Sequence, residues 1–309
     1  MSHSHAHGHG HFHSHDGGDG PHAVLMRRAS YASVVMATVL LLSKFYVWWE
    51  TDSLAMLSSF TDSVFDVVMS LANMLALRYA LKPADEDHSF GHTSIEDIAG
   101  LAQCVFIGVS MGLIVWHSVE RIITPAPILT APELGIGVSA IGMIFTMALV
   151  TYQGYVAKKT GSLIVAADRT HYVSDILFNL GVMAAYVFSS YMGIALADPV
   201  IAIIIAGVVL WSMREVAIRS FNNLMDREMQ DEEKARINTI VSTTPGVIRH
   251  HHLKTRHSGV KSFIQMHVDM DADLNFREVH AITDALEEAL YKAFPAAEVI
   301  IHPEPVEIT

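Results

Sequence analysis

The feature that most constrains this chain is a series of six apolar segments, each near the roughly 20 residues that an α-helix needs to cross a bilayer. Of the 309 residues, 51% are hydrophobic and only 17% are charged. Soluble domains average roughly 25% charged residues, so the composition predicts an integral membrane protein. The expected helices cover about residues 30–50, 54–79, 97–121, 131–156, 163–190 and 194–213.

Basic residues gather on alternate connections between these segments. The opposite connections carry almost none, with only Arg121 near the 122–131 loop. Lys and Arg accumulate on cytoplasmic loops, so we expect a lipid-embedded, multi-pass protein with both termini in the cytoplasm. The basic residues on that side are Arg27, Arg28, Arg78, Lys82, Lys158, Lys159, Arg214 and Arg219.

The chain divides into three parts by composition. Residues 1–25 alternate His with small residues and are predicted to be a disordered tail. We interpret this tail as a loose metal-capturing segment, with a dispensable tail or a purification-tag remnant as the alternative. No A-x-A-like site follows the first apolar segment, which favours a retained helix over a cleaved signal. Residues 26–213 form the expected membrane domain and 214–309 a cytoplasmic domain.

The cytoplasmic part carries the pattern of a small α+β domain. Periodicity predicts two helices and three strands, and Pro303 and Pro305 are expected to end the last strand. The order helix, two strands, helix, strand implies a sheet with helices on one face. The expected helices are 231–242 and 275–293, and the expected strands are 247–256, 261–270 and 298–302.

Charge and residue usage narrow the ligands. A formal net charge of -12 argues against nucleic acid as a partner. Nineteen histidines against twenty Lys plus Arg are an excess of the residue that binds zinc-like ions. Cys104 is the single cysteine, which rules out an intrachain disulfide framework and a thiolate metal cluster.

Two apolar segments carry ionisable pairs at the same spacing. Asp62 and Asp66 lie four apart in one, and His171 and Asp175 lie four apart in another, so each pair shares a helix face. A single such residue could instead hydrogen-bond a neighbouring helix. Three carboxylates and an imidazole suit Zn²⁺ and also admit Cd²⁺, Fe²⁺ or Co²⁺. Because ligands must lose protons to bind metal, such a site is suited to couple metal to protons.

Two further clusters lie outside the apolar segments. Asp85, His88 and His92 follow the second segment and form either a metal site or a solvated acidic turn. Alternation along a strand predicts that His250 and His252 point one way and His251 the other, which leaves open which of them is a ligand. The histidine-rich set in the cytoplasmic part, interpreted as metal-binding, is His250, His251, His252, His257, His267, His280, His302 and Glu304.

The motifs that carry these residues resemble those of the cation diffusion facilitator family, of the bacterial zinc and iron exporter type. They are TDSVFD (61–66), RYALKPADEDHSFGH (78–92), HYVSD (171–175), RHSG followed by FIQMH (256–267), and VIIHPEP (299–305). The resemblance runs from about residue 26 to 305. It covers nearly all of the chain except the His-rich tail.

The resemblance implies six membrane helices with a cytoplasmic ferredoxin-like domain, a homodimer in the bacterial inner membrane, and export of divalent metal in exchange for protons by alternating access. It implies a transport site, a loop site and a two-zinc site at the dimer interface. Glu304 stands where the family has Asp, and Thr93 and Ser94 replace a Gly-Lys pair, so a family salt bridge near Asp226 does not carry over. By motif, the three sites are Asp62, Asp66, His171 and Asp175; Asp85, His88 and His92; and His251, His267, His280 and His302.

The leading hypothesis is therefore a proton-coupled exporter of Zn²⁺, with Cd²⁺ or Fe²⁺ as further substrates, and not an enzyme. Mn²⁺ also stays open as the physiological metal. The alternative is a membrane-bound metal sensor that binds without transport, although sensing would need only the cytoplasmic domain. A passive channel would move metal without protons. An intramembrane metallohydrolase lacks its H-E-x-x-H motif in this sequence.

Overall fold

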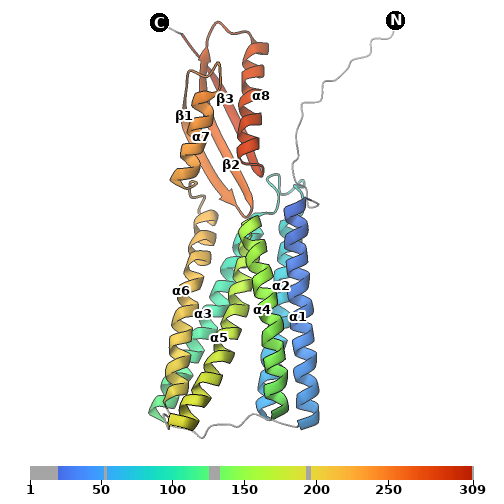
Figure 1. The fold of residues 1–309 in the computed structure, drawn as a ribbon. Coiled ribbons are helices and arrows are strands. Elements are labelled where there is room, and N and C mark those ends of the chain that lie inside the picture. The colour runs from blue at the N-terminus through green and yellow to red at the C-terminus, as the bar shows by residue number, and fades with distance from the viewer. Residues whose placement is uncertain (1–19, 52–53, 125–132, 193–195, 308–309) are drawn as a thin grey trace, which may run out of the picture.

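The computed structural model describes residues 20–51, 54–124, 133–192 and 196–307, and it consists of a bundle of six long helices that carries a small α+β domain at one end (Figure 1). The His-rich segment 1–19 lies outside the described residues. The six helices are α1 (Pro21–Thr51), α2 (Leu54–Ala80), α3 (Ser94–Ile123), α4 (Glu133–Thr160), α5 (Leu163–Met192) and α6 (Ala197–Leu224).

All six expected helices are present. Helix α1 begins at Pro21, so residues 21–25 are helical, contrary to the expectation of a disordered tail up to residue 25. Helix α6 continues to Leu224, and the expected domain boundary at 213/214 therefore falls inside it. The start of α1 and the α+β domain lie at the same end of the bundle (Figure 1).

Five of the described helices, all except α5, include a stretch long and apolar enough to cross a membrane. Helix α5 has 30 residues, which at about 1.5 Å per residue also exceeds the hydrocarbon thickness. It carries Asp168, Arg169 and Asp175 within two turns, and these lower its mean hydropathy. Asp168 and Asp175 face neighbouring helices, as the contacts below show, whereas Arg169 is exposed.

The α+β domain contains α7 (Asp231–Thr243), β1 (Arg249–Ser258), β2 (Lys261–Asp271), α8 (Phe276–Ala293) and β3 (Ala297–Val306). The strand order is β1-β2-β3, with β1 antiparallel and β3 parallel to the central β2. This confirms the expected order of elements. A crossover through α8 is required because parallel neighbours cannot be joined by a tight turn.

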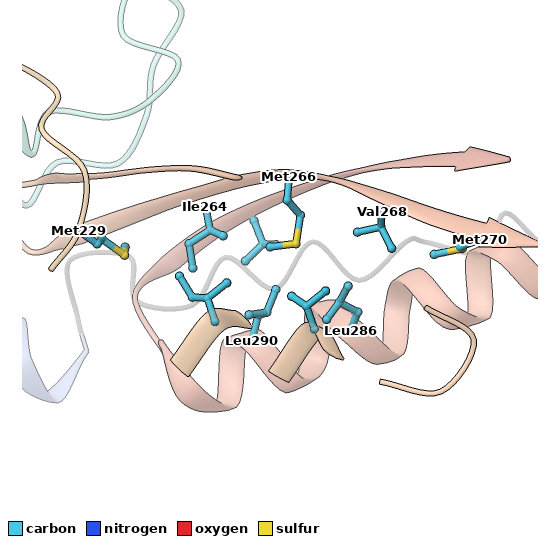
Figure 2. Close-up of a cluster of buried hydrophobic side chains, with 10 residues drawn as sticks. Met229, Ile264, Met266, Val268, Met270, Leu286 and Leu290 are labelled. Carbon is cyan, nitrogen blue, oxygen red and sulfur yellow. The ribbon is translucent and has the colours of Figure 1, made fainter. Parts of the chain in front are cut away.

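One face of the sheet is covered by both helices. Alternate residues of β2, from Ile264 through Met266 and Val268 to Met270, are at most 1% exposed and point toward Leu286 and its neighbours on α8 (Figure 2). Because side chains alternate along a strand, the residues between them point to the opposite face. That second face carries the histidines described below.

The prolines near the C-terminus do not end the last strand. Pro303 pairs with Val268 and Pro305 with Met270 in the parallel ladder. Strand β3 is at the edge of the sheet, where alternate N–H groups point away from the neighbouring strand and are not needed for pairing. Two prolines spaced by two residues can both occupy such positions, so the expected strand end at residue 302 is wrong.

The two domains are joined by hydrogen bonds at the start of α3. Asp97 is 1% exposed and accepts hydrogen bonds from the backbone N–H of Gly259, at 2.6 Å, and from the Asn223 amide, at 2.8 Å. Ser258 Oγ lies 2.9 Å from Thr93 Oγ1. The turn between β1 and β2 is therefore anchored on the membrane domain.

Candidate metal centres

Helices α2 and α5 are bridged by one ligand pair inside the bundle. His171 Nε2 lies 3.1 Å from Asp66 Oδ1 and 3.9 Å from Asp175 Oδ2. One atom from each of these three residues lies within 4.8 Å of the others. A histidine and two carboxylates are suitable ligands for zinc and similar ions. The helical spacing at 171 and 175 explains why both face α2 together.

Asp62 does not join this group in the structure. It lies one turn before Asp66 on α2 and its carboxylate is exposed along that helix. The grouping within 4.8 Å contains Asp66, His171 and Asp175 only. Asp62 still interacts electrostatically with Asp66 and Asp175. A four-ligand site would therefore need a side-chain movement of Asp62 toward the other three.

Lys44 of α1 is a charged neighbour that the sequence reading missed. Its Nζ donates a 2.8 Å hydrogen bond to Ser63 Oγ, next to Asp62 on α2. Its positive charge acts on both Asp62 and Asp175. A lysine within an apolar helix is costly unless it is used, and that signal was available in the sequence. The positive charge of Lys44 therefore competes with a metal cation for the negative charge of these carboxylates.

A buried polar network lies one turn before His171 on α5. Asp168 is 4% exposed; its Oδ2 accepts hydrogen bonds from Ser33 Oγ at 2.7 Å and Gln153 Nε2 at 2.6 Å, and its Oδ1 accepts one from Asn73 Nδ2 at 3.0 Å. These donors come from α1, α4 and α2. The network ties α5 to three other helices and thereby fixes its rotation, which sets where His171 points.

The loop between α2 and α3 gathers Asp85, His88 and His92. His92 Nε2 lies 3.2 Å from Asp85 Oδ2, and His88 Nδ1 lies 3.3 Å from Asp85 Oδ1. The His88 backbone N–H donates to Asp85, and this hydrogen bond holds the pKa of that carboxyl below its usual range. The three residues form a compact ligand set.

His92 is the residue of this loop that most needs a further partner. Its side chain is 1% exposed, its Nδ1 has no hydrogen-bond partner among the described residues, and its Nε2, although 3.2 Å from the Asp85 carboxylate, is not aligned for a hydrogen bond to it. The ring packs edge-on against Tyr79, with centroids 4.6 Å apart. Buried polar atoms without a partner are rare. A metal ion bound by a ring nitrogen would satisfy this histidine, so the observed donors fit a cation.

The open face of the sheet carries three histidines on one row. His251 of β1 pairs directly with His267 of β2, which pairs with His302 of β3. The rings of His251 and His267 are 5.3 Å apart, and those of His267 and His302 are 4.8 Å apart. Strand register alone therefore assembles an imidazole row, because directly opposed residues point to the same face.

Glu304 lies in the middle of this row. Its carboxylate is 2.7 Å from His267 Nδ1, 3.3 Å from His251 Nε2 and 3.8 Å from His302 Nε2. The hydrogen bond from His267 lowers the pKa of the Glu304 carboxyl from its usual value. The Glu304 carboxylate thus lies close to all three imidazoles, although its side chain is one methylene longer than that of the Asp expected at this position from the resemblance.

Other histidines of this domain lie elsewhere. His280 is exposed on α8, 3.5 Å from Asp284, and is in none of the ligand groups of the described residues. His250 contacts Asn238 of α7 at 2.9 Å, and His257 contacts Glu233 at 3.3 Å. The expectation that His252 shares the direction of His250 is wrong, since His252 groups with His251 and His267.

The fold and these sites define a polytopic membrane protein with metal-ligand clusters both between its helices and on its appended domain. Residues 30–225 match the family described as cation efflux transmembrane domain, and residues 229–306 match the cation efflux protein, cytoplasmic domain. The chain belongs to the cation efflux family, the cation diffusion facilitators.

Two FieF pumps that match over nearly their full length support the same assignment. The cation-efflux pump FieF of Salmonella choleraesuis is 40% identical over 284 residues, covering 92% of this chain and 94% of the relative. FieF of Klebsiella pneumoniae is 39% identical with the same coverage. A solved structure of CzrB in a zinc form is 35% identical and covers 25% of this chain and 90% of that chain, with a TM-score of 0.24.

The protein is accordingly a membrane transporter of divalent metal cations, in the direction of efflux, and not an enzyme. The resemblance read from the motifs is confirmed. The sequence also predicted a helical membrane domain followed by a small α+β domain, and this too is confirmed.

Proposed function

We propose that the protein is a proton-coupled antiporter that exports Zn²⁺, with Cd²⁺ and Fe²⁺ as further substrates. The observation that carries this proposal is the ligand pair Asp66 and His171, 3.1 Å apart on two different helices. Ligands on separate helices can be separated or brought together by helix movement. The bound ion therefore holds α2 and α5 in one arrangement and its release frees them for another.

Proton coupling follows from the chemistry of these ligands. Asp66, His171 and Asp175 bind metal only when deprotonated at the ligating atom. The proton that occupies His171 Nε2 or a carboxylate oxygen competes directly with the cation for the same position. Protons arriving from outside the cell would displace the metal there, and the ligands would lose these protons to the cytoplasm when the site faces inward.

The orientation we propose has both termini in the cytoplasm of a bacterial inner membrane. It is supported by the basic residues on alternate connections and by the position of the α1 start and the α+β domain at one end of the bundle (Figure 1). Metal enters between α2 and α5 from that end. Rocking of these helices then exposes the site to the opposite side by alternating access.

The histidine row on the sheet is proposed to regulate a homodimer. His280 is exposed on α8, which covers the opposite face of the sheet, and it is in none of the ligand groups of the described residues, so its role as a ligand would require a second copy. Zn²⁺ held by His251, His267, His302 and Glu304 would then favour one arrangement of the pair. The free energy by which zinc favours one arrangement equals the difference between its binding free energies in the two arrangements.

The test is Zn²⁺ uptake into proteoliposomes that contain a zinc-sensitive dye, under an imposed pH gradient. Wild-type flux should follow the gradient, and Asp66→Ala should lose flux by at least about 100-fold, as expected for the loss of a metal ligand. Asp284→Ala, an exposed carboxylate on α8, is the matched control and should retain flux. Equal flux in the wild type and Asp66→Ala would refute the proposed site.

A metal sensor is the alternative from another class, and it gives a different result in the same assay. It would bind Zn²⁺ tightly with no flux in any variant. A passive channel would give flux that ignores the pH gradient. The position of Asp66 and His171 inside the bundle favours transport over sensing, since a sensor has no need for a site between membrane helices.

A further inference from the structure

His252, which alternation along the strand paired with His250 and opposed to His251, lies instead on the open face of the sheet with His251 and His267. Between His251, which pairs with His267, and Lys254, which pairs with Gln265, β1 has two residues where β2 has one. His252 is in this bulge and has a φ of 52°. A bulge re-aims side chains by breaking the alternation of the strand, so two consecutive histidines are directed to one side.

The backbone at this position is unusual for a residue with a Cβ atom. Positive φ is uncommon outside glycine, and strained backbone of this kind collects at functional sites. Within the described residues, His252 and Asp226 are the two non-glycine positions with positive φ. The strained backbone therefore indicates that the orientation of the His252 side chain has a function.

The side-chain geometry indicates that this function is metal binding. The His252 ring is 4.9 Å from the His251 ring and 5.3 Å from the His267 ring, between centroids. One ring nitrogen from each of the three histidines lies within 4.8 Å of the others. Two nitrogens on one tetrahedral zinc are about 3.4 Å apart, from Zn–N bonds of about 2.0–2.1 Å. Small side-chain rotations, of exposed His252 and of the half-buried His251 and His267, close that difference.

The surroundings leave room for an ion and its remaining ligand. His252, His267 and His302 line a surface cavity together with Lys254 and Gln265. His252 is itself exposed and reaches the cavity from the edge strand β1. A water molecule or an anion attracted by Lys254 can complete the coordination of a metal held there.

We infer that His252 is a metal ligand. With His251 and His267 it forms a three-imidazole site for a borderline divalent cation such as Zn²⁺, Co²⁺ or Ni²⁺. This site adjoins the group formed by His267, His302 and Glu304. The inference extends the proposed metal binding on the sheet face. Three neutral imidazoles favour such ions over Mg²⁺ and Ca²⁺, which prefer oxygen ligands.

The site predicts that residue 252 touches the metal directly, and a thiolate substitution tests this. Full-length His252→Cys, titrated with Co²⁺ in detergent, should develop the near-ultraviolet thiolate-to-cobalt charge-transfer band, because soft thiolates bind such ions well. His250→Cys, on the same strand but directed toward Asn238 of α7, is the matched control and should show no band. Cys104 is common to both variants.

A second measurement keeps the inference testable if the thiolate variant does not fold. Gel-filtered His252→Gln, loaded with Zn²⁺, should carry about one ion fewer per chain than His250→Gln, since a lost ligand weakens binding. The His-rich tail and the other clusters are the same in both and cancel. An absent band in folded His252→Cys, an equal band in His250→Cys, or equal ion counts in the glutamine pair would overturn the inference.

These readouts do not depend on transport. Loss of zinc flux in Asp66→Ala tests the membrane site, whereas the cobalt band reports only on the sheet face. A chain that shows the band but moves no metal would refute the proposed antiport and leave this inference standing. A chain that transports zinc in exchange for protons but shows no cobalt band would refute this inference and leave the proposed antiport standing.

Discussion

The backbone amide of Gly259 donates a 2.6 Å hydrogen bond to the carboxylate of Asp97 and so fixes the α+β domain on the first turn of α3. Gly259 has a φ of +55°, and a Cβ atom there would lie 2.6 Å from the carbonyl oxygen of Thr93. Only glycine fits this approach. The contact connects the domain with the histidine row directly to α3, and the hydrogen bond from Asn223 to the same carboxylate extends the connection to α6.

We predict that Asp97→Ala loosens this junction. It leaves the Gly259 N–H and the Asn223 amide without their acceptor, which destabilises the docked arrangement by about 1–3 kcal/mol. Hydrogen exchange of the turn between β1 and β2 should accelerate. Glu120→Ala, an exposed change at the other end of the same helix, should leave that exchange unchanged. Equal protection in both variants would show that the hydrogen bond does not hold the domain.

Lys44→Met is predicted to tighten zinc binding in the membrane domain. The ammonium group that competes with metal for Asp62 and Asp175 is removed, while the side-chain length is kept. We expect the Kd for Zn²⁺ to fall by about 10-fold, or about 1.4 kcal/mol. Equilibrium titration in detergent measures this, with Lys159→Met as the control on α4. Unchanged or weaker binding would contradict the proposed competition.

Asp168→Asn is predicted to destabilise the helix bundle. The carboxylate accepts from Ser33, Asn73 and Gln153, and an amide offers only one oxygen and brings two donors. We expect a loss of about 1–3 kcal/mol, seen as a lower midpoint of thermal unfolding in detergent. Asp87→Asn, exposed in the α2–α3 loop, is the control. An unchanged midpoint would mean that the network adds little to the folded state.

Zinc is predicted to stabilise the α2–α3 loop through His92. A ligand that binds only the folded state at 100 times its Kd adds about 2.7 kcal/mol, so added Zn²⁺ should protect the loop from proteolysis. His92→Ala should abolish the part of this protection that comes from the loop. His117→Ala, an exposed histidine on α3, should keep it. Full zinc protection without His92 would remove the loop from the set of metal sites.

The grouping of the candidate ligands in the membrane domain was predictable in part, because helical periodicity converts spacing into geometry. His171 and Asp175 share a face by their separation alone, and the folded bundle brings Asp66 of α2 within reach of both. The position of Asp62 was not predictable in the same way. Its distance from the other ligands depends on how α2 is rotated and on the rotamer of its side chain.

The sheet face shows where strand periodicity fails. Alternation correctly separates Met266 from His267, but it misplaces His252, because the bulge at that position depends on pairing with β2. No local signal in the sequence marks the bulge. The continuation of β3 through Pro303 was likewise missed. Proline is tolerated in an edge strand, but the sequence does not show that β3 lies at the edge of the sheet.

The most direct test of proton-coupled export at Asp66, His171 and Asp175 is a simultaneous record of lumenal Zn²⁺ and lumenal pH in proteoliposomes with no imposed pH gradient. Zinc added outside should enter through the fraction of transporters of suitable orientation, and the lumen should become more alkaline as protons leave. His171→Ala should abolish both signals. Zinc entry with an unchanged lumenal pH, or both signals intact in His171→Ala, would contradict the account.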